Sequence, residues 1–246
     1  MGEQLDLSER AELRECMDEP CSYEELRACL RHLAWVNRLT RAHRPVMRWV
    51  QRVVDSIPTS QKRDVGHPLK IVDVGCGYGD MLRQIEKWAI LRGVAVELVG
   101  VDVNANAVRA AREATPAASG ITWVHGTACA SPEAAGADLV TATGMMHHLP
   151  EAEIVRLLDW MEHTARVGWL IVDLHRKPVP YRVFNAVTRF GWWHPFIRPD
   201  GLASIRRSFL TEDWQRMCSA AELNAGAVSI REHRPARLCV ERLKAA

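Results

Sequence analysis

Residues 71–80 read I-V-D-V-G-C-G-Y-G-D, with a carboxylate at Asp73 and glycines at Gly75, Gly77 and Gly79. Alternating apolar residues followed by glycines at every second position predict a strand, a tight turn and the start of a helix. At such a turn backbone amides and the helix dipole face a ligand, and the missing side chains let it contact the main chain. The stretch therefore predicts a cofactor site.

Neighbouring residues separate the ligands that use such a turn. A phosphate-binding P-loop needs Gly-Lys-Ser/Thr at its end, which this stretch lacks. A dinucleotide fingerprint, G-x-G-x-x-G, would place a glycine at position 80, where the chain has Asp80, and an acid there repels a pyrophosphate. A nicotinamide oxidoreductase is thus disfavoured and is kept as the alternative from another enzyme class.

The pattern D-x-G-x-G-x-G-D, together with a second strand ending in V-G-V-D at 99–102, resembles the S-adenosylmethionine site of class I methyltransferases. The resemblance covers residues 69–175. It implies that the glycine loop carries the methionine half of the cofactor, that Asp73 holds its amino group, and that Asp102 accepts hydrogen bonds from the ribose hydroxyls. Carried over by position, the cofactor-binding residues are Asp73, Gly75, Cys76, Gly77, Gly79, Asp102, Val103, Thr127, Ala128 and Thr143.

Two qualifications belong to this resemblance. Family members often carry an acid after the third strand that contacts adenine, whereas this chain reads H-G-T-A-C-A at 125–130, so Thr127 and Ala128 are expected to serve through a hydroxyl or the main chain. The alternative reading is that the glycines only pack the helix on the strand and that Asp102 caps the next helix.

The residues after the fourth strand, T-G-M-M-H-H-L-P at 143–150, bear on the acceptor of the methyl group. They lack the Asn/Asp-Pro-Pro-aromatic motif of methyltransferases that act on nucleic-acid amino groups, and resemble the L-H-H-L of small-molecule methyltransferases. His147 and His148 are candidate bases for a phenol proton, and at most one of two neighbours can face the methyl. No Cys or carboxylate at ligand spacing joins them, so no metal is expected.

Further acceptor contacts are expected after the fifth strand, because ligands of open parallel sheets lie outside the carboxyl ends of the strands. His175 is the other candidate base, and Arg176 could hold a carboxylate or ketone of the acceptor. The long connection up to residue 210 is rich in aromatic residues, and a helix at 180–190 is expected to form a lid over the cofactor cleft. The expected substrate-binding residues are Arg176, Tyr181, Phe184, Trp192 and Trp193.

Periodicity predicts the elements that position these residues. Helical spacing before residue 60 changes, from residue 69, to strands alternating with helices, which indicates a parallel α/β sheet. The expected strands are 69–74, 95–101, 121–125, 138–142, 168–174, 227–232 and 236–241, and the expected helices are 79–92, 104–114, 151–165 and 211–223. Only H-R-P-A separates the last two strands, so they should form an antiparallel hairpin.

The expected fold is therefore a Rossmann-like, seven-stranded, mostly parallel sheet with an antiparallel last strand. An N-terminal helical cap (1–60) precedes a methyltransferase domain (66–246) that carries a substrate-lid insertion (176–210).

Composition narrows the function class. A net charge of +2 in 246 residues, without a basic block, argues against a nucleic-acid partner. The start of the chain lacks the order of a signal peptide and no long apolar run exists, so a cytoplasmic protein without stable membrane insertion is expected. Seven cysteines without a CxxC pair indicate reduced thiols.

Segments 33–42, 173–178 and 204–209 look more specifically like bacterial methyltransferases of polyketide and phenolic-lipid pathways. This implies a small aromatic or polyketide-like acceptor, methylated at a phenolic or quinol hydroxyl. Methylation at carbon and a non-catalytic, cofactor-binding partner subunit are the alternatives. The sequence does not determine the oligomeric state.

Overall fold

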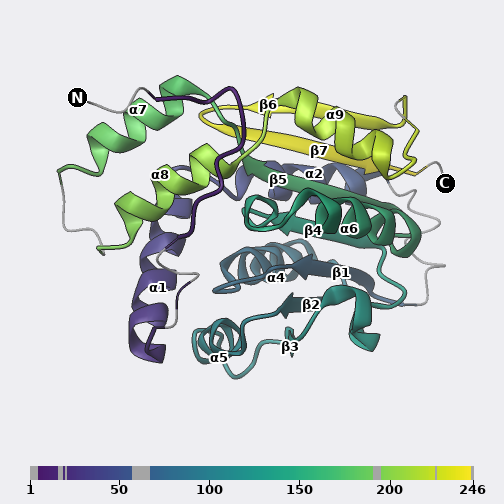
Figure 1. The fold of residues 1–246 in the computed structure, drawn as a ribbon. Coiled ribbons are helices and arrows are strands. Elements are labelled where there is room, and N and C mark those ends of the chain that lie inside the picture. Colours follow the sequence, from purple (N-terminus) through teal and green to yellow (C-terminus); the bar gives the residue numbers. More distant parts are fainter. Residues whose placement is uncertain are drawn as a thin grey trace.

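The computed structural model describes residues 5–15, 19, 21–56, 67–190, 195–224 and 226–244. Its centre is a seven-stranded sheet of order β3-β2-β1-β4-β5-β7-β6 (Figure 1). The strands are β1 (Leu69–Val74), β2 (Val96–Asp102), β3 (Thr122–His125), β4 (Leu139–Thr143), β5 (Gly168–Leu174), β6 (Val228–His233) and β7 (Arg237–Leu243). The first five are parallel and β7 runs antiparallel to β5 and β6, which confirms the predicted fold class.

Helices cover both faces of this sheet, so the architecture is a three-layer α/β/α arrangement (Figure 1). The α-helices are α1 (Tyr23–Leu39), α2 (Arg44–Ser56), α4 (Asp80–Arg92), α5 (Ala105–Glu113), α6 (Glu151–Thr164), α7 (Pro178–Val187), α8 (Ile197–Arg207) and α9 (Thr211–Ala220). Short 3-10 turns are η2 (Ala128–Ala130), η3 (Pro132–Ala134) and η4 (Met146–His148). None of the helices among these described residues is long and apolar enough to cross a membrane.

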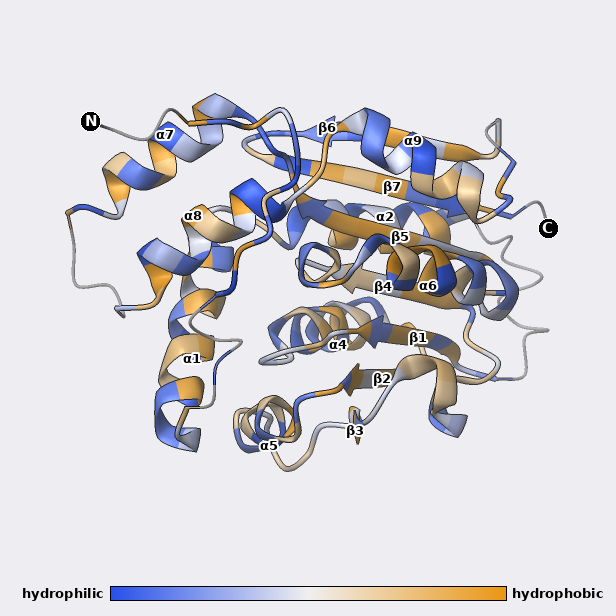
Figure 2. Ribbon diagram, viewed as in Figure 1, coloured by the Kyte–Doolittle hydropathy of each residue, from blue (hydrophilic) through white to orange (hydrophobic). Residues whose placement is uncertain are grey.

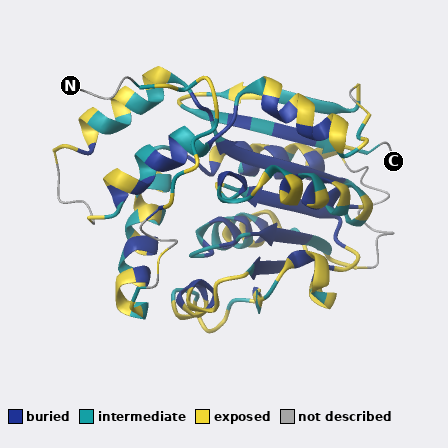
Figure 3. Ribbon diagram, viewed as in Figure 1, coloured by how far each residue is buried: buried dark blue, intermediate teal, exposed yellow. Residues whose placement is uncertain are grey.

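Burial of the sheet explains why its strands read as nearly continuous apolar runs. A strand covered on both faces needs apolar side chains on both, and β1, β4 and β5 are largely orange in Figure 2 and mostly dark blue in Figure 3. One core cluster lies under α2, α4 and α5, and another under α6 and α9. The helical spacing expected before residue 60 is confirmed by α2, whose Val46, Trp49, Val50, Val53 and Val54 are all buried.

The connection between β5 and α9 differs from the prediction. The helix expected at 180–190 is confirmed by α7, but the connection also contains a helix that was not predicted, α8, and the two pack against each other. On α7, Val183 and Val187 are more than half exposed, and Phe190 beyond it is 81% exposed, so this side of the helix faces solvent in the described chain. Periodicity missed α8 because its buried set includes the polar residues Asp200 and Ser204, which break the apolar spacing.

An extended segment, residues 5–15, crosses the end of the sheet where the parallel strands finish (Figure 1). We call it the N-terminal arm. Arg10 donates to the carbonyl oxygens of Arg207, His147 and Leu149, and the Ala11 amide donates to Arg206 O. The arm thereby joins α8 to the turn after β4. No periodic pattern in the sequence marks this arm, because an extended segment held by main-chain contacts needs none.

Candidate active site

The glycine loop 75–79 links β1 to α4, and its backbone amides are used within the fold. Gly75 N and Cys76 N donate to Val101 O at 2.8 and 3.1 Å, Gly79 N donates to Cys76 O at 2.8 Å, and Gly77 N donates to the Asp102 carboxylate at 2.8 Å. A phosphate bound at this loop would need such donors for itself. The loop instead suits a ligand whose nearby group is a cation, which favours an ammonium and sulfonium compound over a dinucleotide.

The three glycines of the loop do different things. All have φ between 52° and 74°, a region that favours glycine. A Cβ at Gly75 would lie 2.8 Å from Met145, and one at Gly79 would lie 2.2 Å from Trp123, so these two allow close packing. A Cβ at Gly77 would meet nothing within 4 Å. The packing alternative therefore holds for Gly75 and Gly79, whereas Gly77 borders open space.

Two polar side chains beside the loop fit the methionine half of the cofactor. Asp73 is buried at the end of β1, where its Oδ1 accepts a hydrogen bond from Thr141 Oγ1 at 2.7 Å. Burial raises the pKa of Asp73 to about 7, because the Thr141 hydroxyl only partly offsets desolvation and Asp80 and Asp102 lie near. The Thr143 hydroxyl is buried without a hydrogen-bond partner in the described chain. A ligand ammonium would donate hydrogen bonds to the Asp73 carboxylate and to the Thr143 hydroxyl oxygen, so these residues fit S-adenosylmethionine.

Asp102 ends β2 as expected, and its two oxygens already hold the loops around it. Oδ2 accepts from Gly77 N and Oδ1 from Asn104 N at 2.9 Å, while the cap of α5 is the Asn104 side chain rather than Asp102. Burial raises the pKa of Asp102, and the two backbone amides oppose this. Each carboxylate oxygen has a second lone pair, so hydroxyls of a ribose can still bind.

The remaining cofactor candidates lie around this edge of the sheet. Val103 is 69% exposed and its carbonyl oxygen lies 3.1 Å from His125 Nε2. Thr127 is exposed, whereas Ala128 is buried at the start of η2. The Cys76 thiol is buried, which raises its pKa and leaves it a packing group rather than a nucleophile.

The structure distinguishes His147 from the other histidines. It lies in η4, directly after the loop in which Met145 contacts Gly75, and its side chain is buried. His147 Nδ1 lies 2.7 Å from Asp173 Oδ1, and its backbone amide donates to Asp173 Oδ2. A carboxylate can only accept, so Nδ1 carries the proton and a neutral ring has its lone pair on Nε2.

Asp173 is itself fully buried at the end of β5. Burial alone would raise its pKa, but the His147 imidazole and the Leu174 amide hold it below the ordinary value for an aspartate. The carboxylate therefore stays charged and fixes the orientation of the ring. Sequence reasoning placed Asp173 only inside a strand, and no spacing in the sequence pairs it with His147.

Glu15 of the N-terminal arm is a site residue that the sequence analysis missed. Its buried carboxylate lies 3.7 Å from His147 Nε2 and 3.8 Å from His148 Nε2, and Ser204 Oγ donates to it at 2.8 Å. Together the carboxylate and the two imidazoles are of types that bind metal ions. The Arg207 guanidinium, 3.6 Å from Glu15, already places a positive charge against the carboxylate.

His175 lies apart from this group. Its amide donates to Ala236 O and it forms a bridge with Phe209, so the backbone joins the end of β5 to the β6–β7 turn and to the segment before α9. The side chain is buried, its Nδ1 is 4.0 Å from Glu232, and burial together with Lys177 lowers its pKa. Among the described residues, no buried carboxylate orients the His175 ring as Asp173 orients the His147 ring.

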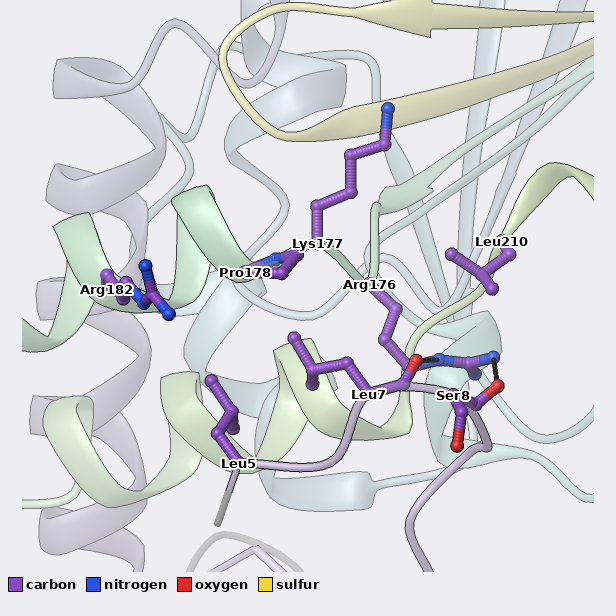
Figure 4. Close-up of a pocket in the computed structure, with 8 residues that line it drawn as sticks. All are labelled: Leu5, Leu7, Ser8, Arg176, Lys177, Pro178, Arg182 and Leu210. Atoms are coloured by element: carbon purple, nitrogen blue, oxygen red, sulfur yellow. Dashed lines mark hydrogen bonds between the residues drawn. The ribbon is translucent and has the colours of Figure 1, made fainter.

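Arg176 is committed to internal contacts. Its guanidinium donates to Leu7 O and Ser8 O of the arm (Figure 4). It also donates to Ser208 O and to the Asp213 carboxylate at 3.1 Å. These bonds clamp the arm to α9 and occupy the donors that an acceptor carboxylate would need. A hollow of about 530 Å³ lies here between the arm and α7, and no candidate histidine lines it.

Of the four aromatic candidates in the insertion, the structure describes two. Tyr181 and Phe184 lie on α7, and the Phe184 ring occupies the position that a Cβ at Gly201 of α8 would take. Phe184 therefore packs α7 on α8. Trp192 and Trp193 lie outside the described residues.

Comparison with known proteins identifies the central part of the chain. Residues 71–168 match the family model described as "Methyltransferase domain". Trans-aconitate 2-methyltransferase of Azoarcus sp. (strain BH72) is 32% identical over 108 residues, which are 44% of this chain and 39% of that protein. This chain thus matches well under half of the length of that curated relative.

Solved structures share the fold. The plantazolicin methyltransferase BpumL, in complex with a triazolic desmethylPZN analog and SAH, matches 91% of this chain and 98% of its own with a TM-score of 0.56 and 14% identity. The CMeT domain of the citrinin polyketide synthase matches 79% of this chain and 50% of its own, with a TM-score of 0.57 and 15% identity. At such identities the likeness concerns the fold.

Proposed function

Since the chain contains a class I S-adenosylmethionine-dependent methyltransferase domain, we propose that it transfers the methyl group of this cofactor to a small hydrophobic acceptor, at a phenolic or quinol hydroxyl. The cofactor supplies a methyl group on a positively charged sulfur. Transfer to oxygen is an in-line displacement, so the protein must hold the acceptor oxygen behind the methyl carbon and receive its proton.

The observation that carries the proposal is the Asp173–His147 dyad beside the glycine loop. Asp173 fixes the ring so that Nε2 offers the lone pair, and it stabilises the imidazolium that forms when Nε2 takes a proton. Of the three candidate histidines, we therefore propose His147 as the base. His148, its neighbour in η4, lies beside the same Glu15 carboxylate. The backbone amide of His175 donates to Ala236 O and so connects the end of β5 to the β6–β7 turn.

The cofactor side rests on the donors and acceptors of the glycine loop. Asp73 and the Thr143 hydroxyl would hold the amino group, Asp102 the ribose, and the surface at Gly77 would border the methionine chain. A net charge of +2 and the absence of any basic block in the sequence support a small molecule over nucleic acid as the acceptor.

Methylation at carbon is the second candidate, because a base that takes a phenol proton can also take one from an acidic C–H. The plantazolicin methyltransferase BpumL and the CMeT domain of the citrinin polyketide synthase share the fold of this chain. Their names are compatible with either acceptor atom. A partner subunit that binds the cofactor but catalyses no reaction would need the glycine loop but not the Asp173–His147 dyad.

The test begins with calorimetric titration of the full chain with S-adenosylmethionine, S-adenosylhomocysteine and NADH. We expect the two sulfur compounds to bind and NADH not to. Release of S-adenosylhomocysteine is then followed with catechol, hydroquinone and resorcinol as probe acceptors, and the methylated atom is identified by mass spectrometry and NMR.

His147→Gln should lower kcat by about 100-fold or more while S-adenosylhomocysteine still binds, since general-base catalysis contributes on that order. His163→Gln is the matched control, because His163 is an exposed histidine on α6. Equal turnover in wild type and His147→Gln would remove His147 from the mechanism, and binding of NADH alone would remove the methyltransferase function.

A further inference from the structure

Arg237 lies at the same edge of the sheet as the cofactor loop. It is the first residue of β7 and pairs with Leu174, the last residue of β5. Because β7 runs antiparallel to the parallel strands, its beginning meets their carboxyl ends. Leu174 follows Asp173 of the dyad, so Arg237 starts beside the proposed acceptor face.

The guanidinium of Arg237 has little to bind within the described chain. Its one hydrogen bond there runs from Nη2 to Thr40 Oγ1 at the C-terminal end of α1, and this bond is long at 3.5 Å. Arg176, by contrast, donates four hydrogen bonds. A guanidinium offers five N–H donors, so most of those of Arg237 remain for another acceptor.

The environment of Arg237 makes the lack of hydrogen-bond partners unfavourable for its guanidinium. Burial lowers the pKa of the guanidinium, and the carboxylate of Asp173 acts in the opposite direction without forming an ion pair with it. A partly buried cation with one weak bond lacks the solvation it would have in water. An anion brought to this position would restore it, and a carboxylate matches the fork of N–H groups.

Other basic side chains at this end of the molecule already have partners. Residues 40–43 lead from α1 to α2, and His43 Nε2 lies 2.7 Å from Asp80 while its Nδ1 lies 2.6 Å from Gln84 Nε2. Arg83 donates to Tyr78 O at 2.7 Å. Since His43 approaches the first residue of α4, the α1–α2 connection that holds Thr40 borders the glycine loop as well.

We infer that Arg237, together with the Thr40 hydroxyl, forms a carboxylate-binding site at the end of the proposed active site. The inference rests on the proposed function, because two carboxylates can reach this edge of the sheet. One is the methionine carboxylate of the cofactor, whose neighbouring ammonium would lie at Asp73. The other is a carboxylate of the acceptor itself. Both would bind by charge-assisted hydrogen bonds from the same guanidinium.

Calorimetric titration of the full chain separates these sources. The ligands are S-adenosylhomocysteine and its decarboxylated analogue, 5′-(3-aminopropylthio)-5′-deoxyadenosine. If the cofactor carboxylate binds here, Arg237→Gln weakens S-adenosylhomocysteine by about 10- to 100-fold, the loss expected for charged hydrogen bonds, and leaves the analogue unchanged. Arg237→Lys keeps the charge and should lose less, and Arg231→Gln removes an exposed arginine from the adjacent β6 as the matched control.

The acceptor arm compares 3,4-dihydroxybenzoate with catechol, by ligand-observed NMR. A loss of 3,4-dihydroxybenzoate binding alone in Arg237→Gln assigns the site to an acidic acceptor. Equal affinities of wild type and Arg237→Gln for both carboxylate ligands overturn the inference. If the wild type binds no S-adenosylhomocysteine, the proposed function fails, and the benzoate comparison still decides the role of Arg237. Thermal melting of both Arg237 variants establishes that they are folded.

Discussion

Asp73→Asn should stabilise the folded chain at alkaline pH. In the fold the pKa of Asp73 rises from 3.8 to about 7, because burial outweighs the Thr141 hydrogen bond. The folded state therefore keeps a proton that the unfolded state has lost. This contribution to stability is complete below pH 3.8 and is lost as the pH rises through 7. Between pH 5 and pH 8 the loss amounts to roughly 2–3 kcal/mol. Asparagine cannot ionise, so it avoids this loss.

Urea unfolding of wild type and Asp73→Asn at pH 5 and pH 8 measures this difference. The stability of the variant relative to wild type should increase by roughly 2–3 kcal/mol from pH 5 to pH 8. Asp173→Asn is the matched control, because Asp173 is buried as well but has a lowered pKa. It should be less stable than wild type at pH 8, and the deficit should shrink as the pH falls below 4.

The same substitution should weaken the cofactor site. The amide has no negative charge for the ligand ammonium, so affinity for S-adenosylhomocysteine at pH 8 should fall by about 10-fold or more. A variant that is more stable and binds less would explain why a buried carboxylate stands at the end of β1. A stability difference that is the same at pH 5 and pH 8 would refute the reasoning about Asp73.

Three other substitutions have defined outcomes. Asp102→Ala should weaken S-adenosylmethionine binding by about 1.5–3 kcal/mol in calorimetry, and an unchanged affinity would mean that the ribose lies elsewhere. Arg176→Met should lower the free energy of unfolding by about 1–3 kcal/mol, because it removes the buried hydrogen bonds to Ser208 O and Asp213 while Arg216 still neutralises Asp213. Cofactor affinity of the folded protein should stay unchanged, and weaker binding would mean that Arg176 belongs to the ligand site. Gly79→Ala should cost about 1–3 kcal/mol, since φ is 74° and the Cβ would meet Trp123, and an unaltered melting temperature would contradict that packing.

The sheet could be predicted from the sequence because its information is local. Alternating or continuous apolar runs predict strands, and glycines mark their ends. The first and last residues of each expected strand lie within two residues of the observed bounds. Even the final hairpin followed from a connection too short for a crossover helix. The position of the glycine loop and of Asp102 at the ends of β1 and β2 followed from the same runs.

The proposed acceptor side could not be predicted in this way. Its members come from distant parts of the chain: Glu15 from the arm, His147 from the turn after β4 and Asp173 from the end of β5. Each pairs through side chains whose neighbours carry no periodic signal. For Arg176 the sequence predicted a ligand-binding role from its position after a strand. The structure shows that its guanidinium binds the N-terminal arm instead.

The sequence by itself determined the fold class, the glycine loop and the position of Asp102 at the end of β2, since a strand, a turn and a helix are encoded by residues close together. Only the tertiary structure decided which glycine borders open space, which histidine has a carboxylate behind it and which arginines already have partners. These properties depend on side chains brought together from separate elements, and burial makes each such contact strong or costly.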